Sequence, residues 1–309
     1  MVASSADGSR QPVWFWAPTS AEPVPLLIEL HSWSMTCDGA DGPNTYFLKP
    51  CQKAGWAIVI PNFRGANETP QACGSDLAVR DVLDAVSAAK KRVKVDEERV
   101  YLVGGSGGGM MALLLAGRHP DVWAACAAAC PISDLVRWHD ETLAFKDWRT
   151  KYAGMIEKCC GGKPTERRAD YFHRSPATWL ESAQNLPIDI CEGIHDGHKG
   201  SVPVGHSIRA FNILANEVDR LSDSEIDFIQ QNERVPPSLA GSWSDPFFSP
   251  SNRIYFRRIS RNARITLFEG GHSGNFSAAF DWLSRQRRGR PADWTVPATG
   301  AGQADAVSR

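Results

Sequence analysis

Short apolar segments recur along the chain, and segments with helical periodicity lie between them. From the second segment onward the apolar runs are mostly continuous, which is typical of strands covered on both faces of a parallel sheet. These runs lie at residues 13–16, 26–30, 57–60, 100–103, 124–130, 188–194 and 265–268.

The helical pattern is clearest at residues 77–92, where apolar side chains return every three or four positions and Ser75 or Asp76 can cap the first turn. Residues 207–218 and 275–285 follow the same pattern. Strands that alternate with helices predict an α/β fold with a mostly parallel, doubly wound sheet.

Two segments interrupt this alternation. Residues 133–186 contain helical pieces but no clear strand, as expected for a helical cap insertion, and residues 221–261 are polar and loop-rich. Long insertions of this kind usually shape or cover a site. We therefore expect one domain over residues 1–288 with these two inserts. We expect a disordered tail over residues 289–309, which are rich in Pro, Ala and Gly.

Composition narrows the range of partners. The 309 residues include 34 Lys and Arg against 35 Asp and Glu, so we expect no nucleic-acid partner. No apolar run is long enough to span a membrane. Residues 1–8 lack the apolar core of a secretion signal, which leaves a cytoplasmic protein or one whose signal has been removed. The sequence leaves the oligomeric state open.

The eight cysteines form neither a CxxC pair nor a Cys/His cluster with zinc spacing. Three fall in apolar, strand-like segments and are expected to be buried: Cys126, Cys130 and Cys191. The others fall in loop-like or surface contexts, and the sequence leaves a disulfide among them open: Cys37, Cys51, Cys73, Cys159 and Cys160.

The chemistry begins at residues 104–108, which read Gly-Gly-Ser-Gly-Gly between a predicted strand and a helical run. Strand, sharp turn and helix form the context of a nucleophile elbow, in which the serine hydroxyl stands clear of the backbone. A serine hydroxyl is a weak nucleophile and needs a base, which in turn needs an acid to orient it. Ser106 is therefore the candidate nucleophile.

The candidate base and acid follow two later strands. His272 lies in a glycine-rich loop directly after residues 265–268, and Asp196 lies just past residues 188–194 with a glycine after it. The order Ser, Asp, His is that of α/β-hydrolases. Glu192, within the preceding strand, is a weaker rival for the acid.

An oxyanion hole needs two donors. The backbone N–H of Gly107 supplies one, and the loop after residues 26–30 supplies the other, either from the Trp33 backbone or from the His31 side chain. His195 and His198 could be taken as metal ligands, but only His206 is near them in sequence. We therefore expect no metal and no other cofactor.

Together these motifs resemble the catalytic domain of the prolyl oligopeptidase family, peptidase family S9, from about residue 25 to 283. The resemblance implies an α/β-hydrolase fold and a triad of Ser106, Asp196 and His272. It rests on residues 62–65, 74–82, 95–100, 104–108, 175–176, 193–196, 202–203 and 271–272.

The sequence departs from this family in three ways. There is no room in the chain for the N-terminal β-propeller of the larger peptidases. Gly107 stands where relatives usually have tyrosine, which led us to expect extra room beside the serine for a bulky acyl group. The family's oxyanion tyrosine falls at about His31.

The sequence thus predicts a serine hydrolase that works through an acyl-enzyme. The relatives without a propeller favour a carboxylic ester hydrolase, of the acetyl, feruloyl or carbohydrate-esterase type. The alternative is an S9 peptidase acting on short peptides, and a more distant one is a non-catalytic binding protein. Because aromatic faces suit sugar rings and aromatic acyl groups, Trp33 and Trp138 are expected to bind substrate, with His195 framing the pocket.

Overall fold

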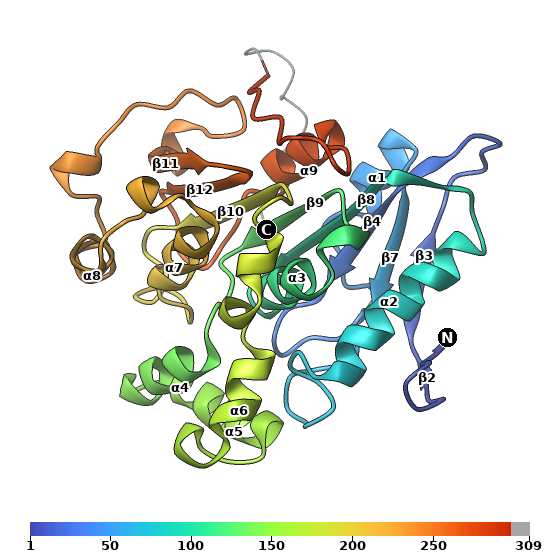
Figure 1. The fold of residues 1–309 in the computed structure, drawn as a ribbon, viewed down its shortest axis with the longest axis horizontal. Helices are drawn as coiled ribbons and strands as arrows, with labels where there is room; N and C mark the ends of the chain where they lie inside the picture. Colours follow the sequence, from blue (N-terminus) through green and yellow to red (C-terminus); the bar gives the residue numbers. More distant parts are fainter. Residues whose placement is uncertain (298–309) are drawn as a thin grey trace.

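The computed structural model describes residues 1–297 of the chain. Its centre is an eight-stranded sheet in the order β11-β12-β10-β9-β8-β4-β7-β3, seen crossing the molecule in Figure 1. The two edge strands run antiparallel to their neighbours, and the other pairs are parallel. The strands are β3 (Val13–Trp16), β4 (Val24–Leu30), β7 (Ala57–Pro61), β8 (Val95–Gly105), β9 (Ala125–Ala129), β10 (Ile188–Gly193), β11 (Ile254–Ser260) and β12 (Ala263–Phe268).

Helices cover both faces of this sheet, which confirms the predicted α/β-hydrolase fold. Leu26 and Ile28 of β4 pack with α2, α3 and α7, whereas Leu27 faces the other side and packs with α1 and α9. Because successive residues of a strand point to opposite faces, a continuous apolar run is needed to fill both cores. The helices are α1 (Leu48–Ala54), α2 (Asp76–Lys90), α3 (Gly107–Arg118), α4 (Leu135–Ala144), α5 (Lys151–Cys160), α6 (Pro164–Arg174), α7 (Gly205–Leu214), α8 (Asp223–Asn232) and α9 (Phe276–Arg285).

Short paired strands complete the fold outside the central sheet. β1 (Val2–Ala3) pairs with β2 (Arg10–Gln11), and β5 (Asp38–Gly39) pairs with β6 (Gly42–Pro43). Ser75 caps α2 by accepting a hydrogen bond from the Ala78 amide.

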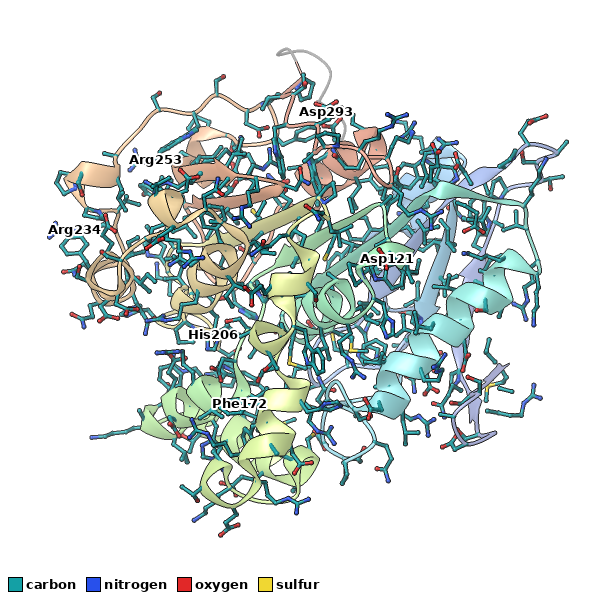
Figure 2. The ribbon with its side chains drawn as sticks, viewed as in Figure 1. Asp121, Phe172, His206, Arg234, Arg253 and Asp293 are labelled. Carbon is teal, nitrogen blue, oxygen red and sulfur yellow. The ribbon has the colours of Figure 1, made fainter. Side chains whose placement is uncertain are left out.

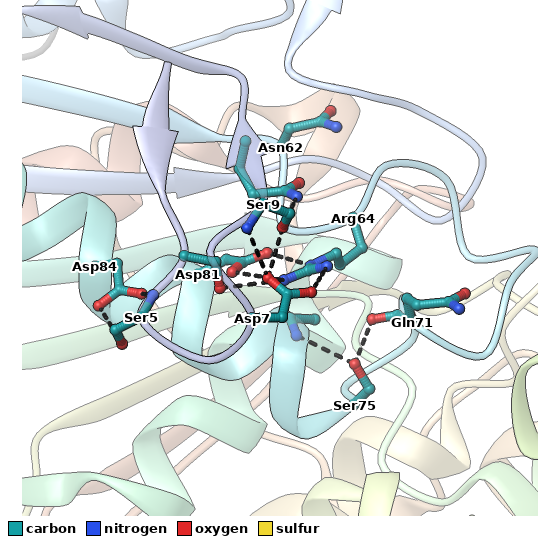
Figure 3. Close-up of polar contacts among 12 residues, drawn as sticks. Ser5, Asp7, Ser9, Asn62, Arg64, Gln71, Ser75, Asp81 and Asp84 are labelled. Carbon is teal, nitrogen blue, oxygen red and sulfur yellow. Dashed lines mark hydrogen bonds and ion pairs between the residues drawn. The ribbon is translucent and has the colours of Figure 1, made fainter.

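The N-terminal loop is tied to α2 by Arg64, whose contacts are drawn in Figure 3. Its guanidinium binds Asp81 at 2.5 Å and Asp7 at 2.8 Å. These two carboxylates raise the pKa of Arg64, while Arg64 lowers the pKa of Asp7. Arg64 itself has a φ of 77°, so its backbone is held in the left-handed region by the surrounding contacts.

Residues 133–186 form α4, α5 and α6 between β9 and β10, at the bottom of Figure 1. They contact the loop that follows β10 directly. The Trp138 indole N–H donates to the Ser201 carbonyl at 2.8 Å, and Arg149 donates to the Gly197 carbonyl at 2.6 Å. This helical segment therefore braces the loop that carries Asp196.

The second insert is more regular than its composition suggested. Residues 221–261 contain α8, which opens with a capping box of Ser222 and Glu225, and the edge strand β11. Arg257 and Arg258 interrupt the apolar run of β11, so this strand lacks the mostly continuous apolar pattern of the other strands. Arg257 is accommodated because it pairs with Asp245 at 2.9 Å.

The tail and the cysteines differ from expectation. We expected disorder from residue 289 onward, but Trp294 stacks on Trp282 of α9 at 5.1 Å, and residues 298–309 lie outside the described part of the chain. All eight cysteines are free. Those assigned to loops or to the surface are in fact buried: Cys37, Cys51, Cys73, Cys159 and Cys160. Among residues 1–297, none of the helices has both the length and the apolar character needed to cross a bilayer.

Candidate active site

Ser106 lies in the turn between β8 and α3. Its φ of 58° and ψ of −123° are strained for a residue with a side chain. The turn is fixed because the Ser106 amide donates to the Ala129 carbonyl at 2.9 Å, and its carbonyl accepts from Met110 at 2.9 Å. A side chain at Gly104 would collide with the backbone of Gly108, so glycine is required on the flank. This is the geometry of a nucleophile elbow.

His272 and Asp196 are joined by a hydrogen bond of 2.5 Å between Nδ1 and Oδ2. Asp196 is fully buried, and its other oxygen accepts from the amides of Gly197 at 2.8 Å and Val202 at 3.2 Å. The side chain of His272 is 26% exposed. An aspartate held in this way orients the imidazole and leaves Nε2 as the nitrogen that can take a proton.

The strand order brings this pair to the elbow. The Ser106 amide is hydrogen-bonded to the Ala129 carbonyl, and Cys130 is the next residue after Ala129. The Cys130 sulfur, one carboxylate oxygen of Asp196 and one ring nitrogen of His272 all lie within 4.8 Å of one another. Among the described residues, no hydrogen bond joins the Ser106 hydroxyl to His272. Such a contact commonly tightens only when substrate binds.

Two backbone N–H groups beside the serine have the arrangement expected of an oxyanion hole. The amides of Gly107 and Trp33 have no hydrogen-bond acceptor within residues 1–297. They lie close together, because a Cβ built on Gly107 would be 2.5 Å from the Trp33 nitrogen. The Ser32 hydroxyl donates to the Gly105 carbonyl at 3.0 Å and so ties this loop to the elbow.

The expected alternative, an oxyanion contact from the His31 side chain, is wrong. The ring nitrogens of His31 face the carbonyls of Ser32 at 3.0 Å and Asn62 at 2.9 Å, and the ring stacks on Phe63. Neither nitrogen is left to reach a substrate. Burial lowers the pKa of His31, which favours the neutral imidazole, and the ring packs against Phe63.

The three residues expected to bind substrate are engaged elsewhere. Trp33 and Trp138 are both buried and pack edge to face at 4.7 Å, so neither offers an open ring face. His195 lies between Glu233 at 2.7 Å and Glu269 at 2.8 Å. The two tryptophan rings therefore differ from the substrate-binding role expected of them, whereas the contacts of His195 join loops around the site.

The histidines near Asp196 do not converge on a metal site. His206 lies between α7 and α4, where Figure 2 labels it. Its Nδ1 is 3.1 Å from the Ser133 hydroxyl, and its Nε2 is 2.9 Å from a carboxylate oxygen of Glu141. His198 contacts the Gln230 carbonyl at 2.7 Å. Within residues 1–297 the single convergent group of Cys, Asp and His side chains is that of Cys130, Asp196 and His272.

Glu192, the weaker candidate for the acid, is a buried carboxyl. It is fully buried in β10, and neither of its oxygens has a hydrogen-bond partner within the described residues. Burial raises the pKa of Glu192 well above its ordinary value, and the negative charge of Asp196 raises it further. Burial therefore favours the neutral form of Glu192, whereas Asp196 makes the hydrogen bond to His272.

Replacing Glu192 with glutamine should make the protein less sensitive to rising pH. Unfolded Glu192 loses its proton near pH 4.5, whereas folded Glu192 keeps it to a higher pH. Above pH 4.5 the wild type therefore loses up to about 1.4 kcal/mol of stability per pH unit at this site, and Glu192→Gln does not. Melting temperatures from pH 4 to 8 measure the difference, with exposed Glu181→Gln as the control. Parallel curves for Glu192→Gln and the wild type would mean that Glu192 is ionised in the fold.

Gly107 does not leave the acyl-group space that its sequence context suggested. The space beside it is filled by the backbone of Trp33, since a Cβ at Gly107 would lie 2.5 Å from the Trp33 nitrogen and 2.6 Å from its Cα. Glycine at this position lets the oxyanion loop approach the elbow.

We expect Gly107→Ala to displace the Trp33 loop and to lower kcat by about 10²- to 10³-fold, the usual effect of losing one oxyanion donor. Gly154→Ala is the matched control, because its Cβ meets nothing within 4 Å on a helix. It should retain activity and gain about 0.5–1 kcal/mol of stability. Steady-state kinetics and melting curves report both effects, and a fully active Gly107→Ala variant would contradict the oxyanion assignment.

The sequence model of the Prolyl oligopeptidase family matches residues 44–228, which is more than half of the chain. This chain belongs to that family. The matched region includes the elbow and Asp196, and His272 lies beyond it.

Comparisons with individual S9 proteins agree. The acylamino-acid-releasing enzyme of mouse (Mus musculus) is 32% identical over 139 residues, which cover 40% of this chain and 18% of that enzyme. The chain thus matches only a minor part of this relative. A Mycobacterium tuberculosis puromycin-hydrolyzing peptidase superposes with a TM-score of 0.61 at 15% identity, covering 94% of this chain and 39% of that one. An acylaminoacyl peptidase in complex with Z-Gly-Gly-Phe-chloromethyl ketone superposes with a TM-score of 0.59 at 15% identity, covering 90% and 40%. Both of these solved structures share the fold of this chain.

Proposed function

We propose that this protein is a serine peptidase that cleaves short peptides whose amino terminus carries an acyl group. The observation that carries the proposal is the family match across the elbow and Asp196, together with a relative named for releasing acylamino acids. These comparisons favour the peptidase alternative over the ester hydrolase that we had expected. The peptide-like ligand of a structural neighbour points the same way.

In the proposed mechanism the Ser106 hydroxyl attacks the peptide carbonyl while His272 Nε2 takes its proton. Asp196 holds the ring in the required tautomer and stabilises the imidazolium that forms. The amides of Gly107 and Trp33 donate to the oxyanion. His272 then gives its proton to the leaving amine, and water hydrolyses the acyl-enzyme by the same route.

The charges around the site support a blocked amino terminus. Glu233 and Glu269 are both occupied by His195, and Glu269 also accepts a hydrogen bond from Tyr255. A free ammonium group would have to displace these partners and would lose much of its hydration. An acylated amino terminus is neutral and makes no such demand.

We further propose that residues 133–186 act as a cap that positions the Asp196 loop, and that residues 221–261 form a second wall of the site. The hydrogen bonds of Trp138 and Arg149 to carbonyls of residues 197–201 support the first role. The hydrogen bond between His195 and Glu233, which follows α8, supports the second.

Three substrates separate the candidate activities. We expect acetyl-alanine p-nitroanilide to be cleaved with kcat/KM at least about tenfold above that of alanine p-nitroanilide, because only the second carries a charge to desolvate. Ethyl ferulate should be a poor substrate. Initial rates with wild type and Ser106→Ala measure this preference. Efficient Ser106-dependent hydrolysis of ethyl ferulate with neither anilide cleaved would restore the ester hydrolase.

A further inference from the structure

Cys130 lies at a strained position directly behind the triad. It follows β9 with a φ of 37°, in a region of backbone conformation that favours glycine. Its amide donates to the Cys191 carbonyl at 3.0 Å, and Pro131 follows it. A glycine there would avoid the strain. The chain instead carries a thiol, and the mechanism described above does not use it.

The thiol faces two residues of the triad. The Cys130 sulfur, one carboxylate oxygen of Asp196 and one ring nitrogen of His272 all lie within 4.8 Å of one another. In a tetrahedral zinc site, with metal–ligand bonds of about 2.0–2.3 Å, ligand atoms are about 3.3–3.8 Å apart. Small side-chain rotations therefore suffice to close these three groups around one ion.

We propose that Cys130, Asp196 and His272 form an inhibitory binding site for Zn²⁺. A thiolate, an imidazole and a carboxylate are the ligand types that zinc takes, and three protein ligands leave the fourth position to water. Mg²⁺ and Ca²⁺ prefer oxygen ligands and do not fit this set. Since Cys130 and Asp196 are buried and His272 is partly exposed, the ion would enter past the His272 ring.

The binding step exchanges one proton for one ion. The Cys130 thiol loses its proton to solvent, its sulfur bonds to Zn²⁺, and His272 commits a nitrogen lone pair to the metal. The ring is then unable to serve Ser106 as base, and activity returns when a chelator removes the ion. The inhibitory effect rests on the proposed function, but the metal site itself does not.

Without the metal the thiol stays protonated. Burial raises the pKa of Cys130 well above its ordinary value, and the negative charge of Asp196 raises it further. A divalent cation reverses this effect, since a coordinating thiol is deprotonated by the ion it binds. Cys130 therefore adds no charge to the triad until a soft divalent cation arrives.

Cadmium titration tests the site without relying on activity. Cd²⁺ bound to a thiolate gives an ultraviolet charge-transfer band, which we expect at one equivalent in the wild type and in Ser106→Ala. The band should be lost in Cys130→Ser and in Cys130→Ala, either of which serves if the other fails to fold. The matched control is Cys191→Ser, since Cys191 lies on the adjacent strand outside the group and its replacement should keep the band. A band that persists in folded Cys130 variants would overturn the proposal.

The inhibition arm uses Zn²⁺ with acetyl-alanine p-nitroanilide. The wild type and Cys191→Ser should lose activity with added Zn²⁺ and recover it with a chelator, and Mg²⁺ should have no effect. Cys130→Ser should need at least about tenfold more Zn²⁺ for half inhibition. Equal zinc sensitivity in Cys130→Ser and wild type would overturn the inference while leaving the peptidase intact. A Cys130-dependent cadmium band in a protein with no hydrolase activity would sustain the site and reject the proposed function.

Discussion

Ser106→Ala should lower kcat/KM for acetyl-alanine p-nitroanilide by about 10⁴-fold or more, with the fold intact. Without the hydroxyl no acyl-enzyme forms, and only substrate binding and the oxyanion donors remain to assist water. Alanine keeps both backbone hydrogen bonds, because the amide that donates to Ala129 and the carbonyl that accepts from Met110 are main-chain groups. The melting temperature should therefore stay close to that of the wild type.

The control for this variant is Ser273→Ala. Ser273 is exposed beside His272, and its hydroxyl reaches only the Gly271 carbonyl at 3.5 Å. Its replacement should leave kcat/KM within about twofold of the wild type. If Ser106→Ala kept a tenth or more of the wild-type rate, another residue would have to be the nucleophile.

Asp196→Asn should have the second largest effect, a fall in kcat of about 10⁴-fold near neutral pH. Asparagine fits the same space and can still accept from the amides of Gly197 and Val202. Its NH₂ group, however, would meet His272 Nδ1 as a donor, which favours the tautomer with the proton on Nε2. That tautomer is unable to take a proton from Ser106.

Comparison with Glu192→Gln shows which carboxyl orients His272. Because burial favours the neutral form of Glu192, its amide variant should retain most of the wild-type kcat, whereas Asp196→Asn should not. Kinetics of both variants at pH 7, with melting curves to confirm folding, measure the contrast. The reverse order of effects would assign the orienting role to Glu192.

The sequence was sufficient to predict those parts of the site whose position depends on the order of strands and turns along the chain. Gly104 and Ser106 occupy a turn whose steric demands leave few other residues, and Asp196 and His272 follow strands whose apolar runs are continuous. Parallel strands carry such residues to the same edge of the sheet, so order along the chain predicts proximity.

Side-chain direction was less accessible from sequence. His31 follows β4 at the expected place, but the direction of its side chain decides whether the ring faces the substrate or Phe63. In the structure the ring stacks on Phe63. Trp33 was assigned to the site for its ring, whereas the structure brings its backbone amide to Gly107 and buries the ring against Trp138. Such choices depend on packing between distant segments, which residue spacing does not encode.

Active-site labelling tests the central claim most directly. A fluorophosphonate reacts with a serine only when a base and an oxyanion hole activate it. After labelling of the wild type and digestion, mass spectrometry should place one adduct on Ser106, and Ser106→Ala should carry none. An adduct on another serine, or no adduct on the folded wild-type protein, would contradict the triad of Ser106, His272 and Asp196.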